Sequence, residues 1–461
     1  MLIFTPNPLS HLRLHKQRGA VLMVMLVILI IGATAMLVSS LNSATLLSTR
    51  NNNTSGALAQ AKEALIGRAV TDANLPGSLP CPDTNDDGIA ESFVYVSALG
   101  AYECPGYIGR LPWKTLGLPD LRDGSGEELW YALSPSFRDQ TLSPPHSLNS
   151  DTLGQFNITG NGATSNVVAI VFSAGSVLSS LNQMRDSANQ NTITNYLEGN
   201  NATNAALIAA DITGGTYTNA STYTFISGAS TTTFNDQMIV IAHDQLFQPV
   251  EMRIAREAKS CLDNYASSSA NKYPWAAPVS DMSYTSTYNT YFGRLSAAPS
   301  NATSSMPMPT HDPSMSTIWT ASCTLFSSTY WLYWNNLVFY QVAKGYQPGV
   351  SMPACISCIN ISGSGNAAAG NGTYRAAVLI ARNALNPTQT TGRTIPTTNP
   401  PNSYLANNTS EYSFDPAFVL NAHDSTSTSP STSFITYKPS DPYYQSVNDL
   451  VLCLDGINNC K

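Results

Sequence analysis

Charged side chains are scarce in this sequence. Lysine, arginine, aspartate and glutamate together make up 11% of its 461 residues. Three of the 22 basic residues, Arg13, Lys16 and Arg18, precede residue 19, so the rest of the chain carries 19 basic and 29 acidic side chains. Nucleic-acid binding depends on basic side chains that neutralise phosphates. The acidic balance therefore argues against a nucleic-acid partner.

Short catalytic motifs are also missing. The sequence contains no G-x-S-x-G, no H-E-x-x-H, no Walker sequence and no dinucleotide-binding glycine pattern. We therefore predict no catalytic residues and interpret the protein as a non-enzyme.

The longest stretch without charge lies near the amino end. Residues 20–49 carry no charged side chain, and residues 20–38 are almost wholly apolar. As a helix, this stretch matches the roughly 20 residues that cross a bilayer. Residues 1–19 hold basic residues and no acid, so the positive-inside bias keeps them in the cytoplasm and sends the rest outward. The sequence therefore predicts a long membrane-spanning helix.

The order of the leader and the apolar run is informative. A secretory signal peptide has its cleavage site after the apolar core, whereas the candidate site here, Gly19-Ala20, comes before it. A basic leader ending in Gly and joined to a retained apolar helix resembles the type IV prepilin signal of pilins and type II secretion pseudopilins. The resemblance implies cleavage after Gly19 by the prepilin peptidase and N-methylation of Ala20. It also implies two kinds of partner, other pilins or pseudopilins and the inner-membrane assembly platform. A plain signal anchor is the alternative.

One position departs from the major pilins, which have Glu at the fifth mature residue. This chain has Val24 there. Because an unpaired carboxylate in an apolar helix bundle is costly, a subunit with nothing above it is better off without one. In this respect the chain resembles the X-type minor pilins and K-type minor pseudopilins, which sit at or near the filament tip. Val24 also fits a protein that never enters a filament.

The segment after the apolar run predicts a helix that packs on a head. Residues 51–56, N-N-N-T-S-G, form a polar break or kink, and Leu58, Ala61, Leu65 and Ala69 then share one helical face. We divide the chain into a leader (1–19), a transmembrane and assembly helix (20–55), a first α+β lobe (56–245), a second α+β lobe (249–455) and a tail (456–461).

A short acidic segment of the first lobe is typical of a calcium loop. Asp83, Asn85 and Asp87 alternate before Gly88, and Glu91 falls at the ninth position. The twelfth position, where an EF-hand needs Glu, is valine, so the loop resembles those of thrombospondin type 3 repeats more closely. Calcium is the candidate cofactor, and a solvated Asx-rich turn is the alternative.

All eight cysteines follow the apolar run. An even number in an oxidising compartment favours disulfides. Proximity in the sequence suggests four pairs, although eight cysteines allow many connectivities. The suggested pairs are Cys81 with Cys104, Cys261 with Cys323, Cys355 with Cys358, and Cys453 with Cys460.

The two lobes repeat several short segments in the same order, which favours an internal duplication. A-Q-A-K-E-A at 59–64 resembles A-R-E-A-K at 255–259, each within a predicted helix. The other similar pairs are Y-I-G-R-L at 107–111 and Y-F-G-R-L at 291–295, L-W-Y-A-L-S at 129–134 and L-V-F-Y-Q-V-A at 337–343, V-V-A-I-V-F-S at 167–173 and A-A-V-L-I-A-R at 376–382, and F-N-D-Q-M-I at 234–239 and V-N-D-L-V-L at 447–452. The expected fold is α+β, with a two-lobed, β-rich, pilin-like head after the membrane helix.

These features lead to one functional expectation. We expect a minor pilin or pseudopilin that caps the tip of a type IV pilus or type II secretion pseudopilus, and that primes assembly or contacts surfaces and substrates. It would lie in the inner membrane with a periplasmic head before assembly, and in the filament or at the cell surface afterwards. The alternative is an anchored periplasmic protein that does not polymerise, either an adhesin-like binding module or an anchored enzyme.

Overall fold

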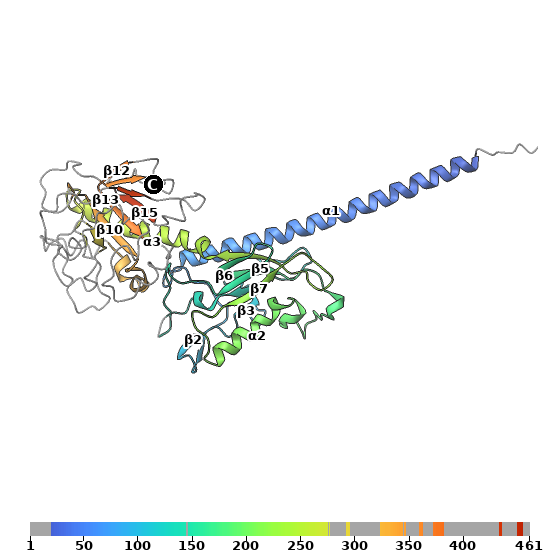
Figure 1. The fold of residues 1–461 in the computed structure, drawn as a ribbon, viewed down its shortest axis with the longest axis horizontal. Coiled ribbons are helices and arrows are strands. Elements are labelled where there is room, and N and C mark those ends of the chain that lie inside the picture. Colours follow the sequence, from blue (N-terminus) through green and yellow to red (C-terminus); the bar gives the residue numbers. More distant parts are fainter. Residues whose placement is uncertain are drawn as a thin grey trace, which may run out of the picture.

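A single long helix carries the head of this protein. The computed structural model describes residues 20–143, 146–274, 276, 292–295, 323–343, 345–346, 359–362, 372–381, 433–435 and 450–454. Helix α1 (Ala20–Thr71) runs unbroken for 52 residues, and its outer half projects away from the rest of the chain (Figure 1). The polar segment 51–56 does not interrupt it. Thr54 there is buried, and its hydroxyl accepts a hydrogen bond from the Gly124 N–H at 2.9 Å, so packing outweighs the weak helix propensity of asparagine and threonine.

The expected membrane span is not supported. Among the helices in the described part of the chain, none is both long and apolar enough to cross a membrane. The structure is a mixed α and β fold with β-rich sheets, and the membrane-helix component of our prediction is corrected.

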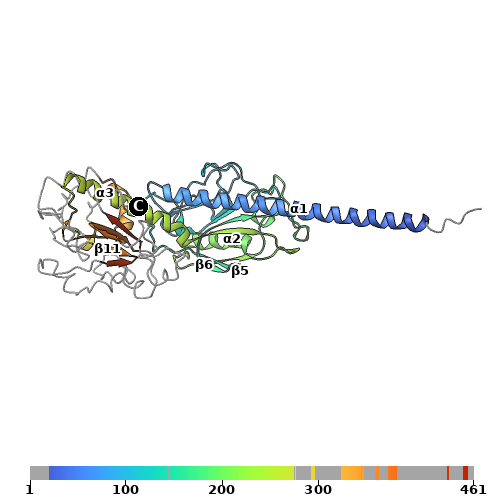
Figure 2. The same cartoon turned by 90° about the horizontal axis from the view of Figure 1, so that it is seen from above.

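The first lobe is built on a six-stranded sheet, which α1 crosses (Figure 2). Its strands follow the order β3-β4-β6-β5-β7, and β8 pairs with the other side of β6. A separate hairpin, β1 (Val94–Val96) and β2 (Ala101–Glu103), extends from the lobe. The sheet strands are β3 (Ile108–Arg110), β4 (Trp130–Leu133), β5 (Phe156–Gly160), β6 (Thr164–Ser173), β7 (Tyr223–Ser227) and β8 (Gln237–Ala242).

The first lobe also has one longer helix and three short 3₁₀ turns. Helix α2 (Asn200–Thr213) covers the outer edge of β7: the Asn201 side chain accepts the Ile226 N–H at 2.8 Å and donates to the Ile226 carbonyl at 3.0 Å. These bonds replace those of a further strand and close an edge that could otherwise pair with another chain. The 3₁₀ turns are η1 (Pro135–Phe137), η2 (Ser179–Leu181) and η3 (Ile193–Asn195).

The second lobe holds a four-stranded sheet in the order β15-β13-β10-β9, together with a three-stranded sheet in the order β12-β11-β14. Helix α3 (His243–Ser268) leads into this lobe and carries Pro249 within it. The remaining elements are β9 (Phe292–Arg294), η4 (Leu325–Ser327), α5 (Trp331–Trp334), β10 (Val338–Val342), β11 (Ile359–Ser362), β12 (Gly372–Tyr374), β13 (Ala376–Ile380), β14 (Ser433–Ile435) and β15 (Leu450–Leu454).

Four strands of the first lobe and four of the second are arranged alike. The series β3-β4-β6-β8 and β9-β10-β13-β15 are both antiparallel throughout. Their registers also agree, because residue pairs along all three strand pairings of one series have counterparts in the other. The corresponding pairs are Gly109–Tyr131 and Gly293–Tyr340, Tyr131–Val171 and Tyr340–Val378, and Val171–Ile239 and Val378–Leu452.

The helices that cover these sheets correspond as well. The inner half of α1 packs on β6 and β8, and α3 packs on β13 and β15. Their buried residues follow the same spacing, namely Ala57, Leu58, Ala61, Leu65 and Ala69 on α1 and Ile254, Ala255, Ala258, Leu262 and Ala266 on α3. The boundary that we placed between residues 245 and 249 falls in the first turns of α3, which is continuous through it. One helix thus belongs to both lobes (Figure 1).

Candidate functional site

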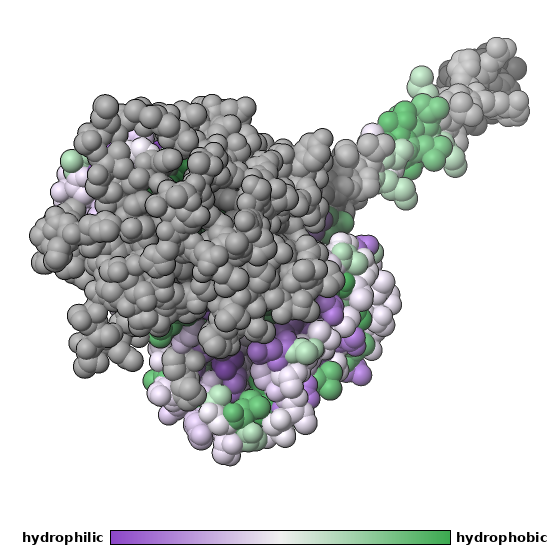
Figure 3. All heavy atoms as spheres, turned by 60° about the vertical axis from the view of Figure 1, so that its left-hand side comes forward, coloured by the Kyte–Doolittle hydropathy of each residue, from purple (hydrophilic) through white to green (hydrophobic). Residues whose placement is uncertain are grey.

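The outer half of α1 is a candidate interaction surface. Every described large apolar side chain in residues 23–31 is at least half exposed, and Met36, Leu46 and Leu47 are exposed as well. Figure 3 shows this apolar region on the stem, beyond the head. Large contiguous apolar surfaces of this kind mark interaction sites in soluble proteins. The stem is therefore built to be covered by another molecule.

Of the two residues at the expected cleavage site, the structure describes one. Gly19 lies outside the described residues, and Ala20 is the first residue of α1. Cleavage itself stays a prediction.

The candidate calcium loop folds as a series of Asx turns. Asp83 is buried, and its carboxylate accepts the N–H groups of Asn85, Asp86 and Gly88 at 2.6–3.0 Å. Two further side chains repeat this pattern: the side chain of Asn85 accepts the N–H of Asp87, and the side chain of Asp87 accepts the N–H of residue 89. The alternation that suggested a calcium loop is thus used to satisfy the backbone of a tight turn.

Glu91 closes the same loop. Its Oε1 accepts hydrogen bonds from the Thr84 N–H and hydroxyl at 3.1 and 2.6 Å. Across the described chain, no group of three or more His, Cys, Asp or Glu side chains is arranged to hold a metal ion. Calcium binding by Asp83, Asn85, Asp87 and Glu91 stays a prediction.

Two disulfides match the pairings that proximity suggested. Cys81 is bonded to Cys104 across 23 residues, and Cys261 to Cys323 across 62 residues. Cys453 is also disulfide-bonded. The other three cysteines, Cys355, Cys358 and Cys460, lie outside the described residues. The first disulfide closes the base of the segment that carries the Asx loop and the β1–β2 hairpin.

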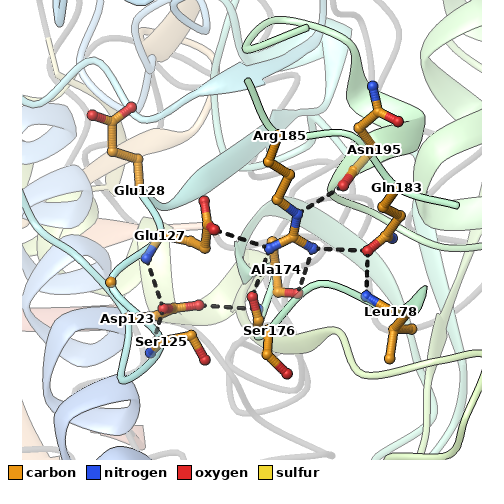
Figure 4. A network of polar contacts seen from close by, with 12 residues as sticks. Asp123, Ser125, Glu127, Glu128, Ala174, Ser176, Leu178, Gln183, Arg185 and Asn195 are labelled. Carbon is orange, nitrogen blue, oxygen red and sulfur yellow. Dashed lines mark hydrogen bonds and ion pairs between the residues drawn. The ribbon is translucent and has the colours of Figure 1, made fainter. Parts of the chain in front are cut away.

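A buried arginine organises the loops at one end of the first sheet (Figure 4). Arg185 donates to the Asn195 and Gly175 carbonyl oxygens at 2.8 and 2.7 Å and to the side chain of Gln183 at 3.1 Å, and forms an ion pair with Glu127 at 3.3 Å. These contacts tie the loop after β6 to the segment before α2. These contacts satisfy the charged group of Arg185, so we assign this residue a structural role.

Asp123 holds the opposite side of this network. Its Oδ2 accepts the Ser173 hydroxyl at 2.7 Å and the Gly175 N–H at 3.0 Å. Its Oδ1 accepts the N–H groups of Ser125 and Glu127 (Figure 4). Every oxygen of this buried carboxylate is thus engaged, which leaves none for a ligand.

Two buried carboxyl groups, Glu198 and Asp236, face each other across the loops next to α2. Asp236 Oδ2 accepts the Glu198 N–H at 3.0 Å and the Asn201 amide at 2.9 Å, and Glu198 Oε2 accepts the Asp236 N–H at 3.2 Å. Burial, followed by repulsion from Glu198, raises the pKa of Asp236 to about 8. Asp236 is therefore protonated at neutral pH and links α2 to β8.

The repeated G-R-L segment places a buried arginine against aromatic rings. Gly109 lies so close to the Asp83 carbonyl that a Cβ would collide with it. Arg110 stacks between Trp130 and Tyr196, with its Cζ 4.3 and 4.2 Å from the ring centroids. In the second lobe the matching arginine packs over the residue that corresponds to Trp130: the Arg294 Cζ lies 5.0 Å from the ring centroid of Phe339.

A small pocket lies beside Arg110. Its lining includes Trp113, Asp120, Leu121 and Glu128. Burial and a hydrogen bond with Asp86 raise the pKa of Glu128 to about 7, and Arg122 holds the Glu128 carboxylate from the other side. These groups pair with one another, and no nucleophile with an adjacent base lines this pocket. We interpret it as a structural feature that fixes the Asx loop to the sheet.

Reasoning from the sequence missed the Arg185 network and the Glu198–Asp236 pair. Their members are separated by tens of residues within polar, Asn-, Ser- and Thr-rich stretches that suggested loops. One signal was available, because Asn235-Asp236 and Asn448-Asp449 occupy the same place in the repeated segments.

Comparison with known proteins adds no assignment. No protein-family model matches the chain, and no curated protein and no solved structure is significantly similar to it.

Proposed function

We propose that this chain is a minor subunit of a type IV pilus-like or type II secretion pseudopilus-like filament. In this proposal α1 packs among the helices of neighbouring subunits, and the two-lobed head lies at the filament tip. The observation that carries the proposal is the exposed apolar stem: the large apolar side chains of residues 23–31 are all more than half exposed, whereas the inner half of the helix packs on the head.

Burial of the stem would supply the assembly energy. Removing one large apolar side chain from water contributes about 1.5–3 kcal/mol, and residues 23–31 present nine such side chains in succession. Val24 is compatible with a position at the filament tip, because no subunit above is there to pair with a carboxylate at this residue. The two disulfides favour an oxidising compartment outside the cytoplasm. The proposed partners are the prepilin peptidase and subunits that share the filament.

The test compares two matched leucines. Leu26 on the stem and Leu207 on α2 of the head are each 55% exposed. We expect Leu26→Asp to remove the chain from sheared, purified filaments, because a buried carboxylate is costly. Leu207→Asp should leave incorporation unchanged. Immunoblots of the filament fraction measure both, and mass spectrometry of the mature amino terminus checks that each variant is cleaved before a methylated Ala20.

Two results would contradict the proposal. One is wild-type incorporation of Leu26→Asp. The other is a wild-type chain that keeps Met1 or is absent from filaments and from their assembly intermediates.

A further inference from the structure

Helix α3 has two halves that pack on different lobes. Its second half covers the sheet of the second lobe through Ala258 and Leu262, among others. Its first half lies against the first lobe: the His243 ring bonds the Ser150 carbonyl at 3.0 Å, and the Phe247 ring lies 5.7 Å from that of Phe137. Both halves use one continuous face of the helix, because the buried positions of the first half are His243, Leu246, Phe247 and Val250.

Helix α1 carries the same face in the same register. When Ala57 is matched to Ile254 and Leu65 to Leu262, the counterparts of the buried first half of α3 fall at the edge of the first lobe, where the Arg50 backbone touches Gly124. All four are exposed on α1, and they are Leu46, Thr49, Arg50 and Asn53. The stem thus repeats the packing of α3 on its own lobe but lacks the second surface that α3 finds on the first lobe.

We propose that this face of α1, which we call the collar (Leu46, Thr49, Arg50 and Asn53), docks on the head of a neighbouring subunit as the first half of α3 docks on the first lobe. The inference rests on the proposed function, since it requires the chain to stand in a filament. The junction between the two lobes is then an internal copy of a contact between successive subunits.

The collar also indicates the chemistry of its partner. Leu46, with Leu47 beside it, needs apolar cover, and Arg50 forms no ion pair with any described residue of this chain. Arg50 is the one charged residue between residues 20 and 61. A complementary head therefore offers an apolar surface with a carboxylate beside it.

The partner is a different, single-lobed subunit. In this chain the surface of the first lobe that receives such a helix is already filled by α3, because Phe137, Leu148 and Ser150 are all fully buried. A subunit with one lobe leaves the corresponding surface free. The chain therefore joins a series of single-lobed subunits at one end and closes it, since its own first lobe cannot accept the next stem.

Photo-cross-linking in assembled filaments tests the inference. A cross-linking amino acid at residue 49, on the collar, is compared with one at residue 51, which is exposed on the opposite face of the same helical turn. We expect residue 49 to react with the head lobe of a distinct chain that has one helical stem and one lobe, as mapped by mass spectrometry of the joined peptides. We expect residue 51 to give no such product.

Cross-links from residue 49 to a second copy of this chain, or to stems alone, would overturn the inference. A probe at residue 26 separates its failure from that of the proposed function: products with neighbouring stems keep the filament assignment, and their absence removes both. As an independent readout, Arg50→Glu should lower incorporation several-fold while Arg50→Lys preserves it. Equal incorporation of the two variants would exclude the predicted carboxylate.

Discussion

Tyr131 and Tyr340 occupy the same position in the two sheets of this protein. Each faces a glycine on the preceding strand and a valine on the following one. Each is fully buried and donates its hydroxyl to a proline carbonyl, Tyr131 to Pro80 at 3.3 Å and Tyr340 to Pro274 at 3.0 Å. The two lobes therefore share strand order, register and one specific buried hydrogen bond.

This correspondence predicts similar costs for one substitution in the two lobes. Tyr131→Phe and Tyr340→Phe should each lower the free energy of unfolding by about 1–2 kcal/mol, because a buried carbonyl loses its donor. The effect should be larger at Tyr340, whose bond is shorter. Urea unfolding measures it, and Tyr95→Phe on the exposed hairpin is the control. An unchanged midpoint for both core variants would contradict the role of the bond.

The Glu198–Asp236 pair predicts a pH dependence of stability. The pKa of Asp236 is raised in the folded state to about 8 by burial and by Glu198, so the folded protein binds a proton that the unfolded chain releases near pH 4. Stability from this group is full below pH 4 and is lost as the pH rises through 8. Asp236→Asn should flatten thermal unfolding profiles between pH 5 and pH 9. A steep profile in Asp236→Asn would assign the dependence to another group.

Arg253 predicts coupled unfolding of the two lobes. Its Nη1 donates to the Val70 and Asp72 carbonyl oxygens, both at 2.6 Å, and its Nε pairs with Glu257 on α3 at 2.7 Å. Arg253→Met removes this link between the end of α1 and α3 and should cost about 2–3 kcal/mol. Calorimetry should then resolve two transitions where the wild type shows one. Arg256→Met, at an exposed position of the same helix, should leave a single transition.

The Asx loop predicts an effect that does not depend on calcium. Asp83→Ala leaves three backbone N–H groups without their acceptor and should cost about 2 kcal/mol. The loss should be present even in a chelator, where Asp87→Ala, at an exposed position, should be much milder. A melting temperature that rises with calcium in the wild type but not in Asp87→Ala would show that the loop binds the ion after all.

The disulfides predict unequal losses. In the chain-entropy description a closed loop of 23 residues stabilises by about 3 kcal/mol and one of 62 residues by about 4 kcal/mol. Replacing both cysteines of the Cys261–Cys323 pair with alanine should therefore lower the unfolding midpoint further than replacing the Cys81–Cys104 pair. Denaturant titrations of the two double variants provide the comparison, and the reverse order would show that local packing dominates.

Much of the head could be predicted from the sequence. The repeated Y-x-G-R-L segments and the other repeated segments overlap all eight of the corresponding strands, because each is a local pattern. The match of residues 376–382 to 167–173 was wrong by two positions, since the strand pairing aligns Ala376 with Ala169. A shift of two preserves which side chains point inward, so alternation alone could not detect it.

The features that could not be predicted from the sequence depend on contacts between distant segments of the chain. The polar residues 51–56 suggested a break, yet α1 continues through them because the loop at Gly124 packs on the helix and bonds Thr54. The Asx loop was ambiguous for a related reason, since the same oxygens can serve a cation or the backbone. To predict the Arg185 network, one would have to know that the loop after β6 and the segment before α2 lie side by side.

The sharing of α3 by both lobes has a mechanical consequence. A force on the second lobe is not taken up by a flexible linker, because no linker separates the lobes within the described chain. Tension passes along one rigid helix to Arg253 and from there into the end of α1. We therefore expect the head to respond as one body, so that a force applied to the second lobe is transmitted to α1.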